Sequence, residues 1–208
     1  MKILFIKSVL CFLILSMFNA YAAGPKSKNT TPSLALPEDV VAGLTLMREE
    51  EKLARDVYLA LYTMHGTAIF SNIANSEQSH MDALKKLLDR YALNDPVGAN
   101  LEGIFTSADL QQLYFQLLAT GSSSTLDALY VGATVEELDI YDLQRLLTEV
   151  ETNSDIAVVY ENLLRGSRNH LRSFHKLIVK NGGSYSPVFI SQTHYDDIVN
   201  SPMERGRR

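Results

Sequence analysis

The chain has 208 residues, of which 46% are hydrophobic and 21% charged, a composition typical of one globular domain with appendages. Its single cysteine, Cys11, lies in the N-terminal segment considered next, which excludes disulfide and thiolate chemistry from the rest of the chain. The net charge is −5, and an acidic chain without a broad basic field is not expected to bind nucleic acid. Any metal would have His, Asp and Glu ligands, which favour iron, manganese or zinc.

The N-terminus has the pattern of a secretory signal peptide over residues 1–22. Two lysines precede the apolar run SVLCFLILSMF, and the small-residue site AYA ends at Ala22. The run is shorter than the roughly 20 residues of a spanning helix, which favours a cleaved signal over a membrane anchor. We therefore expect export to the periplasm or medium, no membrane attachment after cleavage, and a linker over residues 23–36.

The next part of the chain follows helical periodicity. Pro37, followed by two acidic residues, suits the first turn of a helix, and Gly66 suits the end of that helix. This pattern predicts a first helix over 37–66 and a second over 68–91. Turn-forming residues follow, and then a short helix is predicted over 107–119.

Two further long helices are predicted. The first begins at Ser124, which has an acidic residue three positions later in capping-box spacing, and is expected to reach about Val150. The second begins at Thr152, which has the same spacing to an acidic residue, and ends before the Asn-Gly-Gly sequence of residues 181–183.

These elements predict an all-α fold, a four-helix bundle over residues 37–182. The connection of roughly 30 residues between the second and third long helices is too long for a hairpin and fits a crossover that carries the short helix. Residues 183–208 mix apolar residues with turn formers. We expect this segment to form a C-terminal arm packed on the bundle.

The stretch EEEKLARDVY, residues 49–58, places acidic groups within an apolar helical stripe. Glu51 lies on the face expected to be buried, and so do Glu77 and His80 on the second helix. Residues three apart on a helix point the same way, so Glu77 and His80 can act together. Buried acids need a partner, and carboxylates converging with an imidazole form a site suited to iron or manganese.

The remaining polar residues of this stretch have different expected roles. Glu49 and Glu50 lie near the start of a helix and are expected on its solvated face. Tyr58 follows Glu51 by two helical turns on the same face. Its phenol could hydrogen-bond a ligand or carry an electron, which makes it the catalytic candidate.

The chain also contains an internal repeat of a helix pair. Residues 50–57 match 136–143 in both glutamates and the aspartate, and residues 76–84 match 166–174 in the histidine and the apolar residue after it. The alignment pairs Glu51 with Glu137, Glu77 with Ser167, and His80 with His170. Glu136 shares a plausible apolar stripe, so the sequence leaves the choice between Glu136 and Glu137 open.

These residues resemble the ferritin-like superfamily, which includes rubrerythrins and bacterioferritins. In such bundles, one Glu from each of two helices and a Glu-x-x-His pair from each of the other two bind two irons. The chain is also similar to a bacterial family of ferritin-like domains of unknown function that shares the EEEKLARDVY, SEQ-x-H and GS-x-NHL sequences. The resemblance implies metal ligation by Glu51, Glu77, His80, Glu137 and His170, with Glu136 as a further candidate.

The resemblance implies an oxidoreductase with a di-iron or related centre, with manganese or zinc as alternatives. Its partners would be metal ions and a small oxidant, with oxygen, peroxide or ferrous iron as substrate, and a homodimer is allowed. The chain departs from the pattern at Ser167, where the second Glu-x-x-His would have its glutamate. Glu136 or Asp139 could supply that carboxylate. The alternative function is a non-catalytic bundle that serves as an interaction or metal-binding module.

Overall fold

The computed structural model describes residues 36–152 and 154–206, which form helices and loops without a strand. The all-α prediction is thus confirmed, while the expected signal peptide and nearly all of the expected linker lie outside the described residues. The helices are α2 (Glu38–His65), α3 (Ala68–Arg90), α4 (Ala108–Gly121), α5 (Thr125–Leu146), α6 (Asp155–Lys180) and α7 (Gln192–Asn200).

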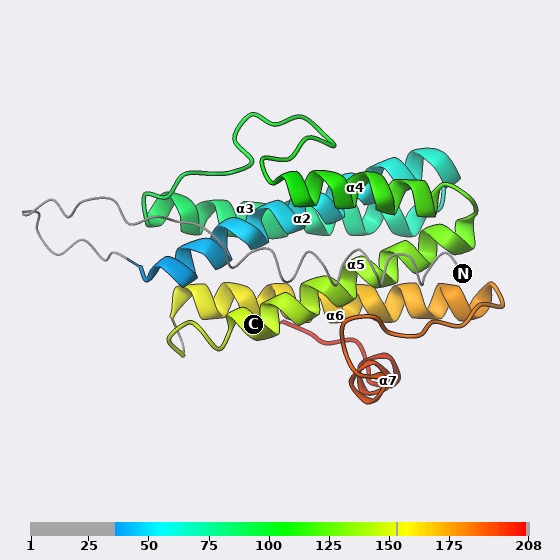
Figure 1. Cartoon of the computed structure of the whole chain (residues 1–208). Helices are drawn as coiled ribbons and strands as arrows, with labels where there is room; N and C mark the ends of the chain where they lie inside the picture. Colours follow the sequence, from blue (N-terminus) through cyan, green and yellow to red (C-terminus); the bar gives the residue numbers. More distant parts are fainter. Residues whose placement is uncertain (1–35, 153, 207–208) are drawn as a thin grey trace, which may run out of the picture.

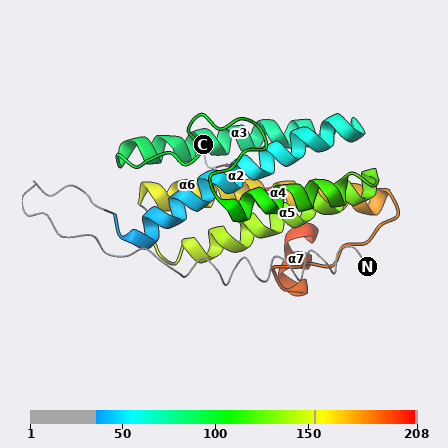
Figure 2. The same ribbon diagram turned by 45° about the horizontal axis from the view of Figure 1, so that its top comes forward.

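The four long helices α2, α3, α5 and α6 form a bundle (Figure 1). Helix α2 packs on α3 and α5, while α6 packs on α3 and α5. The colour gradient of the ribbon shows that α2 and α6 run in one direction and that α3 and α5 run in the opposite direction (Figures 1 and 2). The long connection from α3 to α5 carries α4, which lies against α2 and α5, as predicted for the crossover. Within 36–152 and 154–206, no helix has the length and apolarity needed to span a membrane.

Local capping sets most helix boundaries. The side chain of Ser124 accepts a hydrogen bond from a backbone N–H in the first turn of α5, as the capping-box spacing predicts, and Ser107 caps α4 in the same way. The predicted start of α6 at Thr152 is wrong, because the cap is Ser154, whose Oγ accepts from Ala157 N at 3.1 Å. Helix α5 ends at Leu146, one turn before the predicted end.

The crossover is fixed to the bundle by charged residues of α2. Lys52 and Asp56 pair in the interior, and each also binds the crossover backbone: Lys52 Nζ donates to Leu101 O at 2.8 Å, and Asp56 accepts from Gly103 N at 2.9 Å. Glu49 accepts from Thr106 N at 2.6 Å, close to the start of α4. The expectation that Glu49 is solvated is therefore wrong, because the crossover covers that face of α2.

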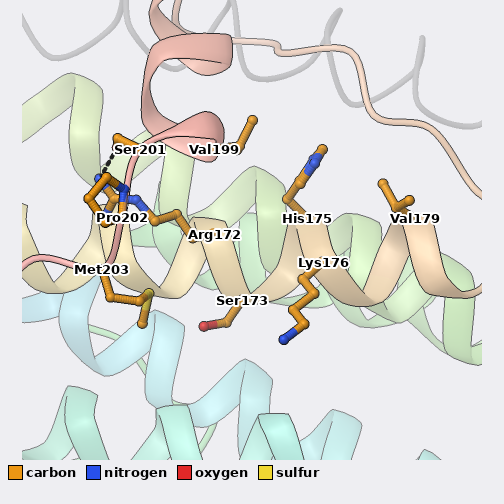
Figure 3. A pocket seen from close by; sticks show the side chains of 9 residues that line it. All are labelled: Arg172, Ser173, His175, Lys176, Val179, Val199, Ser201, Pro202 and Met203. Atoms are coloured by element: carbon orange, nitrogen blue, oxygen red, sulfur yellow. Dashed lines mark hydrogen bonds between the residues drawn. The ribbon is translucent and has the colours of Figure 1, made fainter.

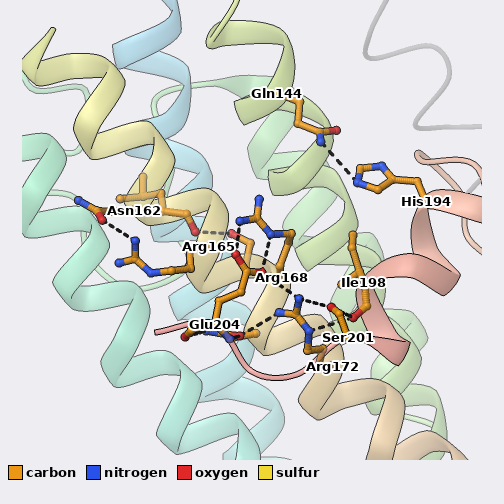
Figure 4. A network of polar contacts seen from close by, with 12 residues as sticks. Gln144, Asn162, Arg165, Arg168, Arg172, His194, Ile198, Ser201 and Glu204 are labelled. Atoms are coloured by element: carbon orange, nitrogen blue, oxygen red, sulfur yellow. Dashed lines mark hydrogen bonds and ion pairs between the residues drawn. The ribbon is translucent and has the colours of Figure 1, made fainter. Parts of the chain in front are cut away.

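The C-terminal arm contains a helix, α7, that packs on α6 and that the sequence pattern did not predict. Figure 4 shows Arg168 and Arg172 of α6 converging on Glu204, which forms ion pairs with both guanidinium groups. Between α6 and the arm lies an open hollow (Figure 3). Its lining residues are Arg172, Ser173, His175, Lys176, Val179, Val199, Ser201, Pro202 and Met203, none of which is a predicted ligand.

Candidate metal centre

The first set of candidate ligands comes from α2 and α3. His80 Nδ1 lies 2.7 Å from Glu77 Oε2 and 3.1 Å from Glu51 Oε2. Glu77 and His80 approach each other because they are one turn apart on α3, and the packing of α2 against α3 brings Glu51 to them. One donor atom from each of the three residues lies within 4.8 Å of the others, which is close enough for one metal ion.

The second set comes from α3, α5 and α6. His170 Nδ1 lies 2.9 Å from Glu77 Oε1 and 3.3 Å from Glu136 Oε2. These three residues also place donor atoms within 4.8 Å of one another. Glu77 belongs to both sets and offers one carboxylate oxygen to each histidine. The centre therefore has two adjacent three-residue sites that share a carboxylate.

The two histidines form the solvent-facing edge of the centre. Their rings stack with centroids 5.7 Å apart, and their side chains are only 14% (His80) and 12% (His170) exposed. His170 Nε2 lies 3.1 Å from Ser76 Oγ. When Nε2–H donates to this hydroxyl, Nδ1 carries the lone pair that a metal needs.

Gly166 of α6 makes room for the His80 ring. A Cβ atom at Gly166 would lie 2.7 Å from His80 Cε1 and 2.7 Å from Nε2. Such a distance is too short for two carbon atoms in contact. The absence of a side chain at this position therefore allows His80 to keep its orientation toward Glu51 and Glu77.

Burial and neighbouring charges shift the pKa values of the cluster. Burial raises the pKa of Glu51 to about 8, although His80 opposes this change. Burial alone would also raise the pKa of Glu77, but His170 and then His80 hold it well below its usual range. Burial opposes charge on His170, yet Glu77 and Glu136 raise its pKa to about 10. In the absence of metal, protons on the imidazoles thus balance the carboxylates.

Several buried oxygens of the cluster lack hydrogen-bond partners. Glu51 Oε1 and Glu77 Oε1 have none among the described residues, although Glu77 Oε1 lies close to His170 Nδ1. Buried carboxylate oxygens left without a donor are costly unless a cation compensates them. Together with the two imidazole nitrogens, these oxygens fit the ligand preferences of iron, manganese or zinc.

Tyr58 is completely buried and lies beside the second site. Its hydroxyl lies 2.5 Å from Glu136 Oε1 and 3.3 Å from Gly132 O. Burial, followed by the charges of Glu136 and Glu77, raises the pKa of Tyr58 well above its usual value, so the phenol keeps its proton. Tyr58 therefore donates to Glu136 and orients this carboxylate toward His170.

The structure separates the two neighbouring glutamates of α5. Glu136 joins the cluster, whereas Glu137 faces the C-terminal arm. The Glu137 carboxylate accepts from the Tyr185 hydroxyl and from three successive backbone N–H groups, those of residues 188–190, at 3.0 to 3.1 Å. With both oxygens occupied, Glu137 is not brought to the centre, and the geometry favours Glu136 as the ligand.

Two further carboxylates are buried near the cluster, Glu50, whose burial the sequence did not predict, and Asp139, a candidate ligand from the sequence. Glu50, expected to be solvated, is only 3% exposed, and its Oε2 has no partner in the described part of the chain. Asp139 is 1% exposed and also has an unpartnered oxygen, Oδ2. The sequence shows a run of three glutamates and places Asp139 one turn after Glu136. Neither pattern indicates which faces of α2 and α5 become covered by other parts of the chain.

Comparisons with known proteins place the chain in a family. A family model described as "Uncharacterized protein domain (DUF2202)" matches residues 41–202. The "Uncharacterized protein MJ0754" of Methanocaldococcus jannaschii is 47% identical over 178 residues, which make up 86% of this chain and 96% of that protein. The crystal structure of hypothetical protein MJ0754 matches with a TM-score of 0.79 at 46% identity, covering 86% of this chain and 100% of that one. The chain therefore belongs to the DUF2202 family.

Proposed function

We propose that this protein is a metal-binding ferritin-like bundle whose two-metal carboxylate centre makes it an oxidoreductase. Glu77, which offers one oxygen to His80 and the other to His170, is the observation that carries the proposal. A carboxylate shared between two His–Glu sets is the arrangement expected of a bridging ligand between two metal ions. Iron is the proposed metal, with manganese and zinc as alternatives.

The arrangement of the ligands across the helices supports the ferritin-like assignment. Glu51 from α2 and Glu136 from α5 each stand beside a histidine from another helix, and α3 carries a complete Glu-x-x-His pair. Di-iron carboxylate bundles have this distribution of ligands. Iron held there would supply one-electron redox chemistry toward oxygen, peroxide or added ferrous iron.

The protein's own groups would control geometry and solvent access at such a centre. Tyr58 holds the Glu136 carboxylate, and Ser76 holds His170 through Nε2. The four long helices bury all three ligand carboxylates, so a small oxidant would approach from the partly exposed histidine edge. Fixed ligands and limited water access favour a defined reaction over leakage of reactive products.

A second candidate function is a bundle that binds metal or a partner without turnover. Ser167 favours it, because the second Glu-x-x-His lacks its glutamate and the repeat supplies fewer carboxylates than the complete pattern. Metal content alone does not distinguish this candidate from the oxidoreductase. The distinguishing property is whether the loaded protein consumes oxygen or peroxide, or oxidises ferrous iron.

Metal analysis of ligand variants tests the proposal. We expect the parent, reconstituted anaerobically with ferrous iron and desalted, to retain about two iron ions per chain. His80→Ala and His170→Ala should each lower the iron content, and Glu77→Gln should lower it most because both sites lose a ligand. His175→Ala is the matched control, since this α6 histidine hydrogen-bonds Tyr195 outside the cluster.

Iron oxidation then separates the two candidates. If the protein is an oxidoreductase, the parent and His175→Ala should oxidise added ferrous iron faster than buffer does, and should consume oxygen as they do so. The ligand variants should not exceed the buffer rate. A parent that binds iron but matches the buffer rate with both oxygen and peroxide supports the metal-binding module. The proposed centre would be ruled out if the parent bound no metal. It would also be ruled out if His80→Ala and His170→Ala kept the metal content of the parent.

A further inference from the structure

We infer that Asp139 supplies the carboxylate that Ser167 lacks and completes the ligand set of the two-metal centre. This inference rests on the proposed function, because it concerns a further ligand of the same centre. Five residues in two overlapping sets, including the shared Glu77, provide the ligands already described. Two irons in a carboxylate bundle take six such residues, so one position remains to be filled.

Ser167 does not fill this position. Its side chain is buried, with 1% exposure, and its hydroxyl donates to Leu163 O at 3.2 Å within α6. A neutral serine hydroxyl bonded to its own helix would be a poor substitute for a carboxylate ligand, because it carries no charge. Ser167 therefore leaves this position of the ligand set without a carboxylate.

The helix directions show on which side of the centre the missing carboxylate would lie. Helices α3 and α6 are antiparallel (Figure 1). Because the two histidine rings stack, one turn back from His80 to Glu77 and one turn back from His170 to Ser167 lead in opposite directions along the bundle. Glu77 thus closes the centre toward one end of the bundle. The side toward the other end, where Ser167 lies, is the one without a shared carboxylate.

Asp139 lies on that open side. Helices α5 and α6 are antiparallel, and Glu136 contacts His170, which places these two residues at the same level. One turn forward from Glu136 on α5 therefore leads in the same direction as one turn back from His170 on α6. Asp139 is three residues after Glu136 and Ser167 three residues before His170, so both lie on the side opposite Glu77.

The Asp139 side chain is also available for a cation. It is 1% exposed, and its Oδ2 has no hydrogen-bond partner within the described ranges. Burial, followed by the negative charges of Glu51, Glu136, Glu50 and Glu77, raises the pKa of Asp139 well above its usual value. A metal ion between these groups would replace repulsion by attraction.

Glu50 provides a matched control for Asp139. It too is buried, and its Oε2 has no hydrogen-bond partner among the described residues. After burial, however, the strongest influence on its pKa is the charge of Asp142, which is bonded to the half-exposed Arg145. The main electrostatic neighbour of Glu50 is thus a residue outside both three-residue sets, Asp142.

The experiment compares Asp139→Asn, Glu50→Gln and the parent. Each protein is stripped with chelator, loaded anaerobically with ferrous iron or with manganese(II), desalted and analysed for metal by mass spectrometry. We expect the parent and Glu50→Gln to retain about two ions per chain and Asp139→Asn about one. Asparagine matches aspartate in volume, so the metal-free variant should melt no lower than the metal-free parent.

A rescue variant identifies the lost group. Adding Ser167→Glu to Asp139→Asn restores a carboxylate on the same side of the centre, and return of the second ion would show that this side needs one. Asp139→Asn that keeps two ions with parental affinity, or Glu50→Gln that loses one in its place, overturns the assignment and leaves the proposed function intact. A parent that binds no metal overturns both.

Discussion

Among single residues, a glycine that offers no ligand atom constrains the orientation of His80. Gly166 faces His80 so closely that an added Cβ would lie 2.7 Å from two ring atoms. The ring is the free end of a side chain and can move, but movement takes Nδ1 away from Glu51 and Glu77. The glycine is therefore a positioning residue, and it stays in the helix interior despite its unfavourable helix propensity.

We predict that Gly166→Ala weakens metal binding without unfolding the protein. The added methyl group displaces His80, and disturbing a group that orients a ligand typically costs about 10- to 100-fold in metal affinity. The melting temperature of the metal-free form should be maintained, because alanine favours the helix by up to about 1 kcal/mol. Competition with a metal-sensitive chelator measures the affinity.

Ser167→Ala is the control for this prediction. It changes the next residue by a similar volume but removes only the hydrogen bond to Leu163 O, and it should bind metal like the parent. Equal affinities for Gly166→Ala and the parent would show that the His80 ring does not depend on this contact.

At the scale of helices, α5 divides its polar residues between the centre and the arm. Glu136 contacts His170 and Tyr58. Glu137 accepts hydrogen bonds from the Tyr185 hydroxyl and from the backbone N–H groups of residues 188–190. The Glu137 carboxylate thus does for the arm what a capping residue does for a helix, by accepting several N–H groups that would otherwise lack a partner. Adjacent glutamates thereby have unrelated roles.

Exchanging each of these glutamates for glutamine should separate the roles. We predict that Glu137→Gln lowers the free energy of unfolding by about 1–3 kcal/mol, because the amide group cannot accept from all the arm's donors. Hydrogen exchange should accelerate at the amides of residues 188–190, with metal content unchanged. Glu136→Gln should do the reverse and lower metal content while the arm stays protected. Loss of metal in Glu137→Gln with normal binding in Glu136→Gln would return the ligand role to Glu137.

The same helix shows where sequence reasoning reaches its limit. Alternation of polar and apolar residues could locate the buried face of α3, and it identified Glu77 and His80 there. Helix α5 is buried around its whole circumference from Val131 to Ile140, since α2, α4, α6 and the arm surround it. When a helix has no solvated face, the positions of its apolar residues do not show which side faces the site. The sequence therefore did not decide between Glu136 and Glu137.

Other differences have similar tertiary causes. The helices of the bundle, the crossover and the cap at Ser124 were predictable because local propensity and spacing determine them. The burial of Glu49 and Glu50 was not, because it depends on where the crossover and α5 come to lie. Helix α7 is short, and its packing on α6 decides its position.

At the scale of the whole molecule, the bundle carries an unusual concentration of buried acid in its interior. Burial raises the pKa of Glu51 to about 8 from an ordinary value of 4.5, and it also raises the pKa values of Glu136, Asp139 and Glu50. Each of these groups binds its proton more tightly in the folded protein than in the unfolded chain. Protonation therefore stabilises the fold when metal is absent.

The sign of the pH dependence follows from these shifts. A carboxyl group with a raised folded pKa contributes stability that is fully present below its unfolded pKa and is lost as pH rises through the folded value. The same holds for His170, whose pKa of about 10 exceeds its ordinary value of 6.5. Glu77 has a lowered pKa and acts oppositely, but its contribution is lost only as pH falls below its ordinary value of 4.5.

We therefore predict that the metal-free protein loses stability steadily from about pH 5 to about pH 9, whereas the metal-loaded protein does not. Bound cations replace the protons and interact with the ionised carboxylates, which removes the cause of the slope. Thermal melts across this range, with chelator in one series and added manganese(II) in the other, measure both profiles. Glu51→Gln should flatten the metal-free profile, because it removes a proton-binding group at the centre without changing the helix. Profiles with the same slope in chelator and in metal would show that these carboxylates do not share a cation, and the two-metal centre would then lose its support.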